Sequence, residues 1–256
     1  MLGAAMPGSR IGRDWADRRQ QMVPLPFPEI EVAEGVFAPT QGSYLLWKTL
    51  FLTGDGHNLH CLDVGSGCGL LGVQMALNGA ASVDALDIQE AAVANTLENA
   101  ELNGVRAAVS AEVADLNHWR PRRRYDLVVA SLYQMPVDPE GEPQRERPPD
   151  FWGRDLLDLF LRLLPQLLVD GGRALVLQLS IVGQEQTAAL LDELGLEGRI
   201  VDFGFFPFGP LFTRNAEQIA IVESLSDAHH IHVGDEDVMI AYALEIRRTS
   251  PDWSSQ

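Results

Sequence analysis

Long apolar runs and positive charge are both scarce in this 256-residue chain. No stretch approaches the roughly 18 apolar residues that a membrane-spanning helix needs, so the sequence predicts a protein that does not enter a membrane. Lys48 is the only lysine, and 19 basic residues stand against 36 acidic ones, which gives a net charge of −17. Nucleic-acid binding usually needs a basic surface, so we expect no nucleic-acid partner.

The only basic cluster lies between Arg120 and Arg124, just before an apolar run. A short charge run of this kind is usually a solvated loop, and we interpret it in that way. Because the cluster does not offset the acidic balance of the chain, a small molecule or a protein side chain is a better candidate substrate than RNA.

Cysteine is rare as well, which argues against a disulfide framework. Cys61 and Cys68 are the only two, and no C-x-x-C pair is present. Two reduced thiols suit a cytoplasmic protein, and residues 1–10 lack the charged start and apolar core of a signal peptide. A single lysine together with abundant alanine is typical of a high-GC bacterial genome. We therefore expect a cytoplasmic, bacterial protein.

The run Leu62–Gly72 predicts the end of a buried strand, a glycine-rich turn and the start of a helix. Such a turn lets the backbone approach a ligand and points the amides of a helix N-terminus at it. Residues 67–72 fit the dinucleotide fingerprint G-x-G-x-x-G, and Asp87 lies at about the right distance beyond it. That fingerprint normally begins directly after the strand, whereas here Gly65 comes first and Asp63 stands just before it.

Taken from Asp63 onward, the unit is D-x-G-x-G-x-G, which resembles motif I of the class I S-adenosylmethionine-dependent methyltransferases. This cofactor has no pyrophosphate but carries an ammonium and a sulfonium, so a nearby carboxylate suits it. Asp87 ends the next predicted strand, where an acid takes ribose hydroxyls, and resembles the family's motif II acid. Asp115, at a third strand end, resembles the position that meets the adenine amino group, with a turn cap as the alternative. The resemblance thus implies S-adenosylmethionine binding by Asp63, Gly65, Gly67, Gly69, Asp87, Asp115 and Ser131.

The tetrad Ser131–Gln134 follows an apolar run that predicts a buried parallel strand. With the segment Val36–Leu46, it resembles the branch that contains release-factor glutamine methyltransferases and small-subunit rRNA guanine methyltransferases. That branch carries Asn-Pro-Pro-Tyr here, and the Asn carbonyl accepts a hydrogen bond from the substrate nitrogen. A serine hydroxyl can also accept, although it is shorter. The candidate catalytic residues are therefore Ser131, Tyr133 and Gln134.

Alternating predicted strands and helices over residues 60–196 indicate a parallel sheet that is covered on both faces. The resemblance implies a Rossmann-like α/β fold with a seven-stranded, mostly parallel sheet whose last strand, 237–247, is antiparallel. We expect an N-terminal extension at 1–33, a methyltransferase domain at 34–248 and a flexible tail at 249–256. The expected helices span 14–22, 43–52, 89–103, 152–169, 185–194 and 213–225, and other expected strands span 106–113, 173–180 and 199–206.

The connection at 207–236 is unusually long for a compact domain, and long connections tend to be functional. Its start is rich in aromatic residues, so we expect it to help wall a substrate pocket, with core filling as the alternative. His229, His230 and His232 lie near its end but lack a cysteine pair or an H-E-x-x-H spacing. We expect no metal site, and His232 is left as a candidate base.

These observations predict an enzyme that transfers a methyl group from S-adenosylmethionine to a nitrogen atom of a small molecule or an amino-acid-type side chain. The sulfonium makes the methyl group a good electrophile, so positioning of the nucleophile carries most of the catalysis. An O-methyltransferase of a secondary metabolite is the alternative enzyme. A non-catalytic, cofactor-binding regulatory module is the alternative of another class, because the tetrad departs from Asn-Pro-Pro-Tyr.

Overall fold

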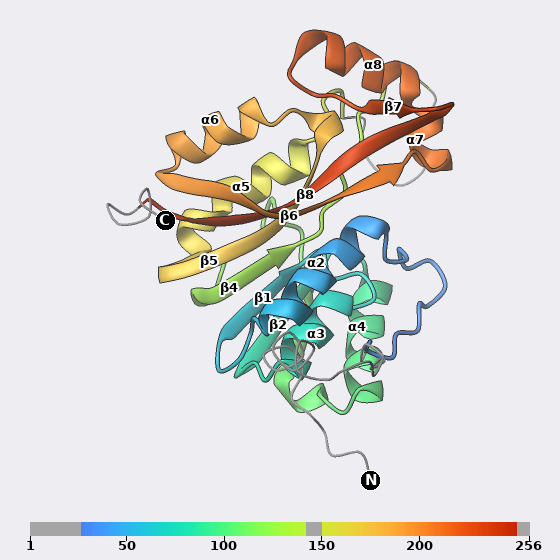
Figure 1. The fold of residues 1–256 in the computed structure, drawn as a ribbon. Helices are drawn as coiled ribbons and strands as arrows, with labels where there is room; N and C mark the ends of the chain where they lie inside the picture. Colours follow the sequence, from blue (N-terminus) through green and yellow to red (C-terminus); the bar gives the residue numbers. More distant parts are fainter. Residues whose placement is uncertain (1–26, 142–149, 250–256) are drawn as a thin grey trace, which may run out of the picture. The chain divides into compact units, whose positions relative to one another are not determined.

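The computed structural model describes residues 27–141 and 150–249. These residues fall into two compact units that divide after Ser131 (Figure 1). The expected helix at 14–22 lies outside the described residues, as do most of the expected extension and tail. The predicted domain boundaries therefore stay predictions. Within the described ranges, no helix is both long and apolar enough to cross a membrane.

The first unit holds a parallel sheet in the order β3-β2-β1-β4. Its register aligns the carboxyl ends of three strands, because Val64 pairs with Leu86 on one side and with Ala130 on the other. Burial of Cys61, Leu62 and Val64 in β1 is nearly complete, as expected of a central parallel strand. The strands are β1 (His60–Val64), β2 (Ser82–Asp87), β3 (Val109–Val113) and β4 (Tyr125–Ala130).

In the described part of this unit, three α-helices accompany the sheet: α2 (Gln41–Thr53), α3 (Leu70–Leu77) and α4 (Glu90–Leu102). The indole Nε1 of Trp47 on α2 donates to Oε1 of Gln74 on α3 at 2.7 Å, and both side chains are buried. The predicted strand at 106–113 is wrong at its start, because η1 (Arg106–Ala108) precedes β3. Gly104 (φ +69°) and this turn reverse the chain between α4 and β3, which an extended backbone could not do.

Asparagines at i, i+4 spacing on α4 hold the extended segment Phe27–Ala33. Asn95, Asn99 and Asn103 accept from the backbone N–H groups of Ala33, Glu31 and Glu29 at 2.9–3.0 Å. The amide nitrogens of Asn99 and Asn103 donate back to the carbonyls of Glu31 and Glu29 at 2.7 and 2.6 Å, and Asn95 also donates to Glu31 at 3.1 Å. The segment thus obtains from side chains the hydrogen bonds that a strand obtains from a neighbouring strand.

The second unit is built around a long strand, β8, that is antiparallel to both of its neighbours, β5 and β6. A short strand, β7, pairs with the start of β8. Val238 pairs with β6 on one edge of β8 and with β7 on the other. The elements are α5 (Asp155–Leu167), β5 (Leu168–Leu179), η2 (Ser180–Val182), α6 (Glu185–Glu193), β6 (Leu196–Pro207), α7 (Pro210–Arg214), α8 (Ala216–Leu225), β7 (Ile231–Val233) and β8 (Glu236–Arg248).

The predicted fold class is confirmed: the protein is α/β, with a mostly parallel sheet and an antiparallel last strand. The described residues contain eight strands, one more than expected, because β7 forms inside the long connection. The helix predicted at 213–225 is confirmed over α8, which ends at Leu225, but its predicted start is wrong because residues 213 and 214 belong to the separate helix α7. Asn215 separates the two helices, with φ −102° and ψ 14° and with its Nδ2 donating to the Leu211 carbonyl at 2.9 Å. Strand β5 also begins at Leu168, five residues before the predicted start.

Candidate cofactor site

The glycines of the turn after β1 adopt backbone conformations that other residues rarely reach. Gly65, Gly67 and Gly69 have φ values of +72°, +53° and +83°, all in the left-handed region that favours glycine. A Cβ at Gly69 would also lie 3.0 Å from Thr96 Cα on α4. The amides of Gly65 and Ser66 both donate to the Leu86 carbonyl of β2, at 2.8 and 2.9 Å. The turn therefore requires glycine at the three alternate positions 65, 67 and 69 of the D-x-G-x-G-x-G motif.

Asp63 lies beneath the turn and is 1% exposed. Its Oδ2 accepts a hydrogen bond of 2.8 Å from the amide of Gly72 in the first turn of α3. Burial raises the pKa of the Asp63 carboxyl to about 7, the Gly72 hydrogen bond opposes this rise, and the nearby charge of Asp87 adds to it. A cation bound here would stabilise the ionised form of Asp63.

Asp87, the last residue of β2, supports the turn from the side. One carboxylate oxygen accepts from the Gly67 amide at 2.9 Å, and the other accepts from the Gln89 amide at 3.0 Å. Each oxygen keeps a second lone pair, so the carboxylate can accept further hydrogen bonds from a pair of hydroxyl groups. Two acids beside the turn favour a ligand with positive charge over a pyrophosphate.

Two residues of α4 that the sequence analysis did not identify hold the turn from below. The Thr96 hydroxyl donates to the Gly67 carbonyl at 3.1 Å, so it accepts from the Ser66 hydroxyl 3.0 Å away. Asn99 donates to the Cys68 carbonyl at 2.8 Å. Both side chains are buried. Polar residues on the buried face of an otherwise alanine-rich helix are the signal that could have revealed them.

Ser131 directly follows β4 and reaches the start of α2. Its hydroxyl lies 3.3 Å from the hydroxyl of Ser43. Ser43 and Thr40 form a capping box, in which each side chain accepts from the backbone amide of the other. The site thus gains two hydroxyl groups that the sequence analysis did not single out, although the T-x-x-S spacing is a helix-start signal.

Asp115 lies two residues beyond β3, as predicted from the strand ends. Its Oδ1 accepts from the backbone and side-chain amides of Asn117, both at 2.9 Å, and its Oδ2 lies 3.1 Å from Nδ1 of His118. These bonds hold the pKa of the Asp115 carboxyl below its usual value, with the Asn117 backbone N–H as the largest cause. The carboxylate therefore stabilises a turn, and its role towards adenine stays a prediction.

Tyr133 and Gln134 belong to the second unit. The buried Gln134 amide donates to the Leu177 carbonyl at 2.8 Å and accepts from the Leu179 amide at 2.9 Å, both on β5. Because both the donor and the acceptor of the Gln134 side chain are engaged by β5, the geometry favours a structural role in which Gln134 fixes the position of its segment. Tyr133 is half-buried. The catalytic roles of Ser131, Tyr133 and Gln134 stay predictions.

A parallel sheet with a glycine turn after its first strand and an acid at the end of the second is the architecture of a nucleotide-type cofactor site. The family model "Ribosomal protein L11 methyltransferase (PrmA)" matches residues 40–138, which include this turn and Ser131. The chain belongs to the class I methyltransferases of this type, a family that normally uses S-adenosylmethionine. It is therefore an enzyme of the methyltransferase class.

Among curated relatives, a protein of Methanocaldococcus jannaschii provisionally named a protein N5-glutamine methyltransferase is 32% identical over 190 residues. The match covers 71% of this chain and 91% of the relative. A ribosomal protein L11 methyltransferase of an Exiguobacterium species is 44% identical over 73 residues, but the chain covers only 23% of that enzyme.

Solved structures support the same fold. A ribosomal protein L11 methylase from Lactobacillus delbrueckii subsp. bulgaricus aligns with a TM-score of 0.53 at 19% identity, covering 86% of each chain. A precorrin 8W decarboxylase from Methanobacterium thermoautotrophicum aligns with a TM-score of 0.51 at 17% identity, covering 86% of this chain and 98% of the other. At this identity the likeness shows the fold alone.

Proposed function

We propose that this enzyme binds S-adenosylmethionine at the turn after β1 and transfers its methyl group to a nitrogen atom of a protein side chain. The observation that carries the proposal is the match to the Methanocaldococcus relative, which spans 71% of this chain and 91% of that protein. The glycine turn, β4 and Ser131 lie within the range of the matching family model. That relative is named for glutamine N5 methylation. A side-chain amide is thus the preferred acceptor among the nitrogen groups that the sequence left open.

The residues of the turn fit this cofactor. Gly65, Gly67 and Gly69 let the backbone approach it closely. Asp63 supplies a carboxylate for its positive charge, and Asp87 has free lone pairs for ribose hydroxyls. When bound, the cofactor supplies an electrophilic methyl group on its sulfonium.

The chain's own residues orient the acceptor. An amide nitrogen is a poor nucleophile, so a hydrogen-bond acceptor beside its N–H group assists the attack. The Ser131 hydroxyl and the Leu132 carbonyl are the groups to which we assign this role. Holding the nitrogen in line with the methyl–sulfur bond accounts for the larger share of catalysis, about 7–11 kcal/mol in well-oriented systems.

An RNA substrate is less well supported, although tRNA methyltransferases are among the relatives. One from Klebsiella pneumoniae is 34% identical, but the chain covers only 38% of it. The net charge of −17 opposes the approach of a polyanion. We therefore keep a protein side chain as the proposed substrate.

The test of cofactor binding is calorimetry with S-adenosylhomocysteine on the full chain. We expect micromolar-range binding, and Asp87→Ala should weaken it by about ten- to a hundredfold, the loss expected of a charged hydrogen-bond acceptor. Asp192→Ala is the matched control, since this exposed acid lies on α6 in the second unit. Tight NAD binding without any response to S-adenosylhomocysteine would overturn the assignment.

The test of the reaction uses the full chain, methyl-deuterated S-adenosylmethionine and a cell extract that is depleted of small molecules. Mass spectrometry of peptides should then find the label on side-chain nitrogen, and Asp87→Ala should remove most of it. Label that appears only in the small-molecule fraction or on oxygen supports the O-methyltransferase alternative. Cofactor binding without S-adenosylhomocysteine formation in any fraction supports a regulatory module.

A further inference from the structure

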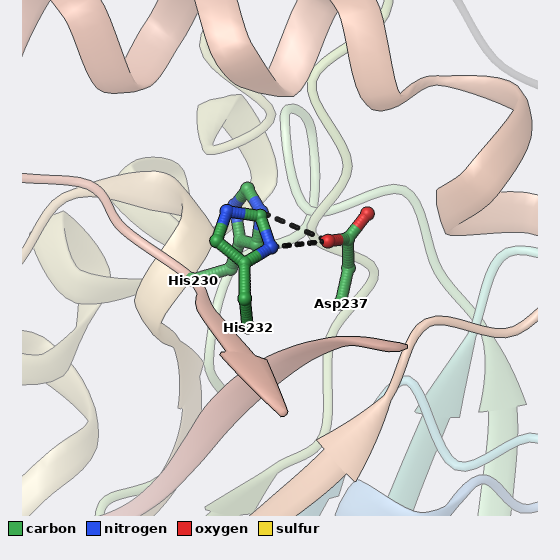
Figure 2. Close-up of side chains that lie close together, drawn as sticks. All are labelled: His230, His232 and Asp237. Carbon is green, nitrogen blue, oxygen red and sulfur yellow. Dashed lines mark hydrogen bonds and ion pairs between the residues drawn. The ribbon is translucent and has the colours of Figure 1, made fainter. Parts of the chain in front are cut away.

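A hairpin in the second unit brings two histidines and an acid together (Figure 2). Strand β7 pairs with β8 in a register that sets His232 directly opposite Asp237. His230 precedes His232 by two residues, so along an extended chain both side chains point to the same side. The two-residue connection Gly234–Asp235 closes the hairpin, with Gly234 at φ +64° as such tight turns require.

The ring nitrogens converge on one oxygen. Nδ1 of His232 lies 2.7 Å and Nε2 of His230 lies 3.4 Å from Oδ1 of Asp237, and Figure 2 shows both rings directed at this carboxylate. One ligand atom from each residue lies within 4.8 Å of the others. Atoms bound at 2.0–2.2 Å to a common ion lie about 3–4 Å apart, so the cluster needs little adjustment to hold one.

A second carboxylate fixes the orientation of His230. Nδ1 of this ring lies 2.7 Å from Oε1 of Glu223 on α8, and both side chains are less than one-fifth exposed. The ring of Phe208 packs against the same imidazole, with centroids 5.1 Å apart. A hydrogen bond from Nδ1 to Glu223 leaves the Nε2 lone pair directed at Asp237. A histidine that binds a metal through one nitrogen and a carboxylate through the other is the usual arrangement in metal sites.

We propose that His230, His232 and Asp237 form a binding site for a divalent transition-metal ion, with Glu223 as the residue that orients His230. Two imidazoles and a carboxylate suit Zn²⁺ and also Co²⁺ or Ni²⁺, whereas Mg²⁺ and Ca²⁺ prefer a full set of oxygen ligands. Three protein ligands leave a further position for water. The ion would take the place of the hydrogen bond between Nδ1 of His232 and Oδ1 of Asp237.

The effect of such an ion is structural. His230 and His232 come from β7 and its approach, Asp237 comes from β8, and Glu223 links the cluster to α8. A metal at this point therefore ties three elements of the second unit together. We expected no metal site here, because these histidines lack a cysteine pair and an H-E-x-x-H spacing. The third ligand depends on the β7–β8 register.

The test is metal titration of the full chain after treatment with a chelator. Calorimetry with Zn²⁺, and visible absorption with Co²⁺, should show one saturable site, and Mg²⁺ should give no signal. His232→Ala removes a side chain that is 73% exposed, so this variant should fold and lose at least about tenfold in affinity. His230→Ala and Asp237→Asn should lose at least as much.

His229→Ala is the matched control, because this neighbouring histidine contacts the Asp227 carbonyl and lies outside the cluster. It should bind like the parent chain. Zn²⁺ should also raise the melting temperature of the parent and of His229→Ala, but not of His232→Ala, because ligand binding to the folded state stabilises it. Equal metal affinity in His232→Ala and in the parent, or no saturable binding of Zn²⁺ and Co²⁺, overturns the proposal. Both readouts are independent of methyl transfer, so their failure leaves the proposed function in place.

Discussion

Asp63 is a carboxyl group that the fold removes almost completely from water. It is 1% exposed, and burial raises its pKa to about 7. Between about pH 4 and pH 7 the unfolded chain ionises this carboxyl while the folded chain keeps it protonated. Stability that depends on Asp63 therefore falls as the pH rises from about 4 to 7 and stays low above that.

Replacement of Asp63 by Asn should abolish this pH dependence. The Asn side-chain oxygen can still accept from the Gly72 amide, but it carries no charge to desolvate. We expect Asp63→Asn to be more stable than the parent at pH 8 by about 1–4 kcal/mol and nearly equal to it at pH 4. Urea unfolding of the ligand-free chain at both pH values measures this. Parallel stability profiles for the two chains would contradict the expected ionisation of Asp63.

A second residue-level prediction concerns Ser131. If its hydroxyl orients the acceptor nitrogen, Ser131→Ala should lower kcat and change S-adenosylhomocysteine affinity less than about threefold, because the lost contact matters for the attack. Tyr133→Phe separates a polar role from ring packing, and the two effects should not add. Steady-state kinetics on the identified substrate, together with calorimetry, is the measurement. An unchanged kcat in both variants would remove this segment from the mechanism.

At the scale of elements, α4 is the support on which the cofactor turn rests. Asn99 of this helix holds both the Glu31 backbone and the Cys68 carbonyl, and Thr96 holds the Gly67 carbonyl. One helix thus fixes an extended segment and the cofactor turn through neighbouring side chains, so damage to it should affect stability and binding together.

Asn99→Ala tests this connection. It removes three hydrogen bonds and leaves the Cys68 carbonyl without this partner, so we expect a loss of about 2–4 kcal/mol in the free energy of unfolding. S-adenosylhomocysteine affinity should fall as well. Asn103→Ala is the matched control, because Asn103 also pairs with the extended segment but does not touch the turn. It should cost about 1 kcal/mol and keep the affinity. Equal losses of affinity in both variants would exclude a specific role for Asn99.

The sequence predicted the elements whose signals are local. Strands β1 and β2, the glycine turn and helix α4 lie where apolar runs and glycine spacing placed them. It did not predict the break at Asn215, since residues 213–225 read as one helix. It also did not predict the contact of Ser43 with Ser131 or the pairing of His232 with Asp237. These depend on which segments the fold brings together, and no short pattern encodes that.

On the scale of the whole molecule, charge is the property that limits partners. The chain carries a net charge of −17, and members of its basic cluster are engaged by acids of the first unit. Arg122 pairs with Glu112 at 2.9 Å, and Arg123 pairs with Asp84 at 3.0 Å and lies over the ring of Tyr125. Such pairs reduce the positive charge that the cluster offers to a phosphate backbone.

Simultaneous replacement of Arg122, Arg123 and Arg124 by Ala tests the partner prediction. We expect methyl transfer to stay within about twofold of the parent, because Arg122 and Arg123 contact Glu112, Asp84 and Tyr125 and not the cofactor turn. Gel shifts with RNA at low and high salt should show no complex for either chain. A salt-sensitive complex that the triple change abolishes would establish a nucleic-acid partner.

The row of asparagines along α4 also bears on the chemical stability of the protein during long storage. Asn103 is followed by Gly104, the neighbour that least hinders the cyclisation by which asparagine loses ammonia, and asparagine is among the thermolabile residues. The product, aspartate, keeps an acceptor for the Glu29 amide but has no donor for the Glu29 carbonyl. Loss of ammonia from Asn103 would therefore add negative charge to an already acidic protein at the outermost of the three pairs. The buried pair at Asn99, beside the cofactor turn, is shielded from the same chemistry.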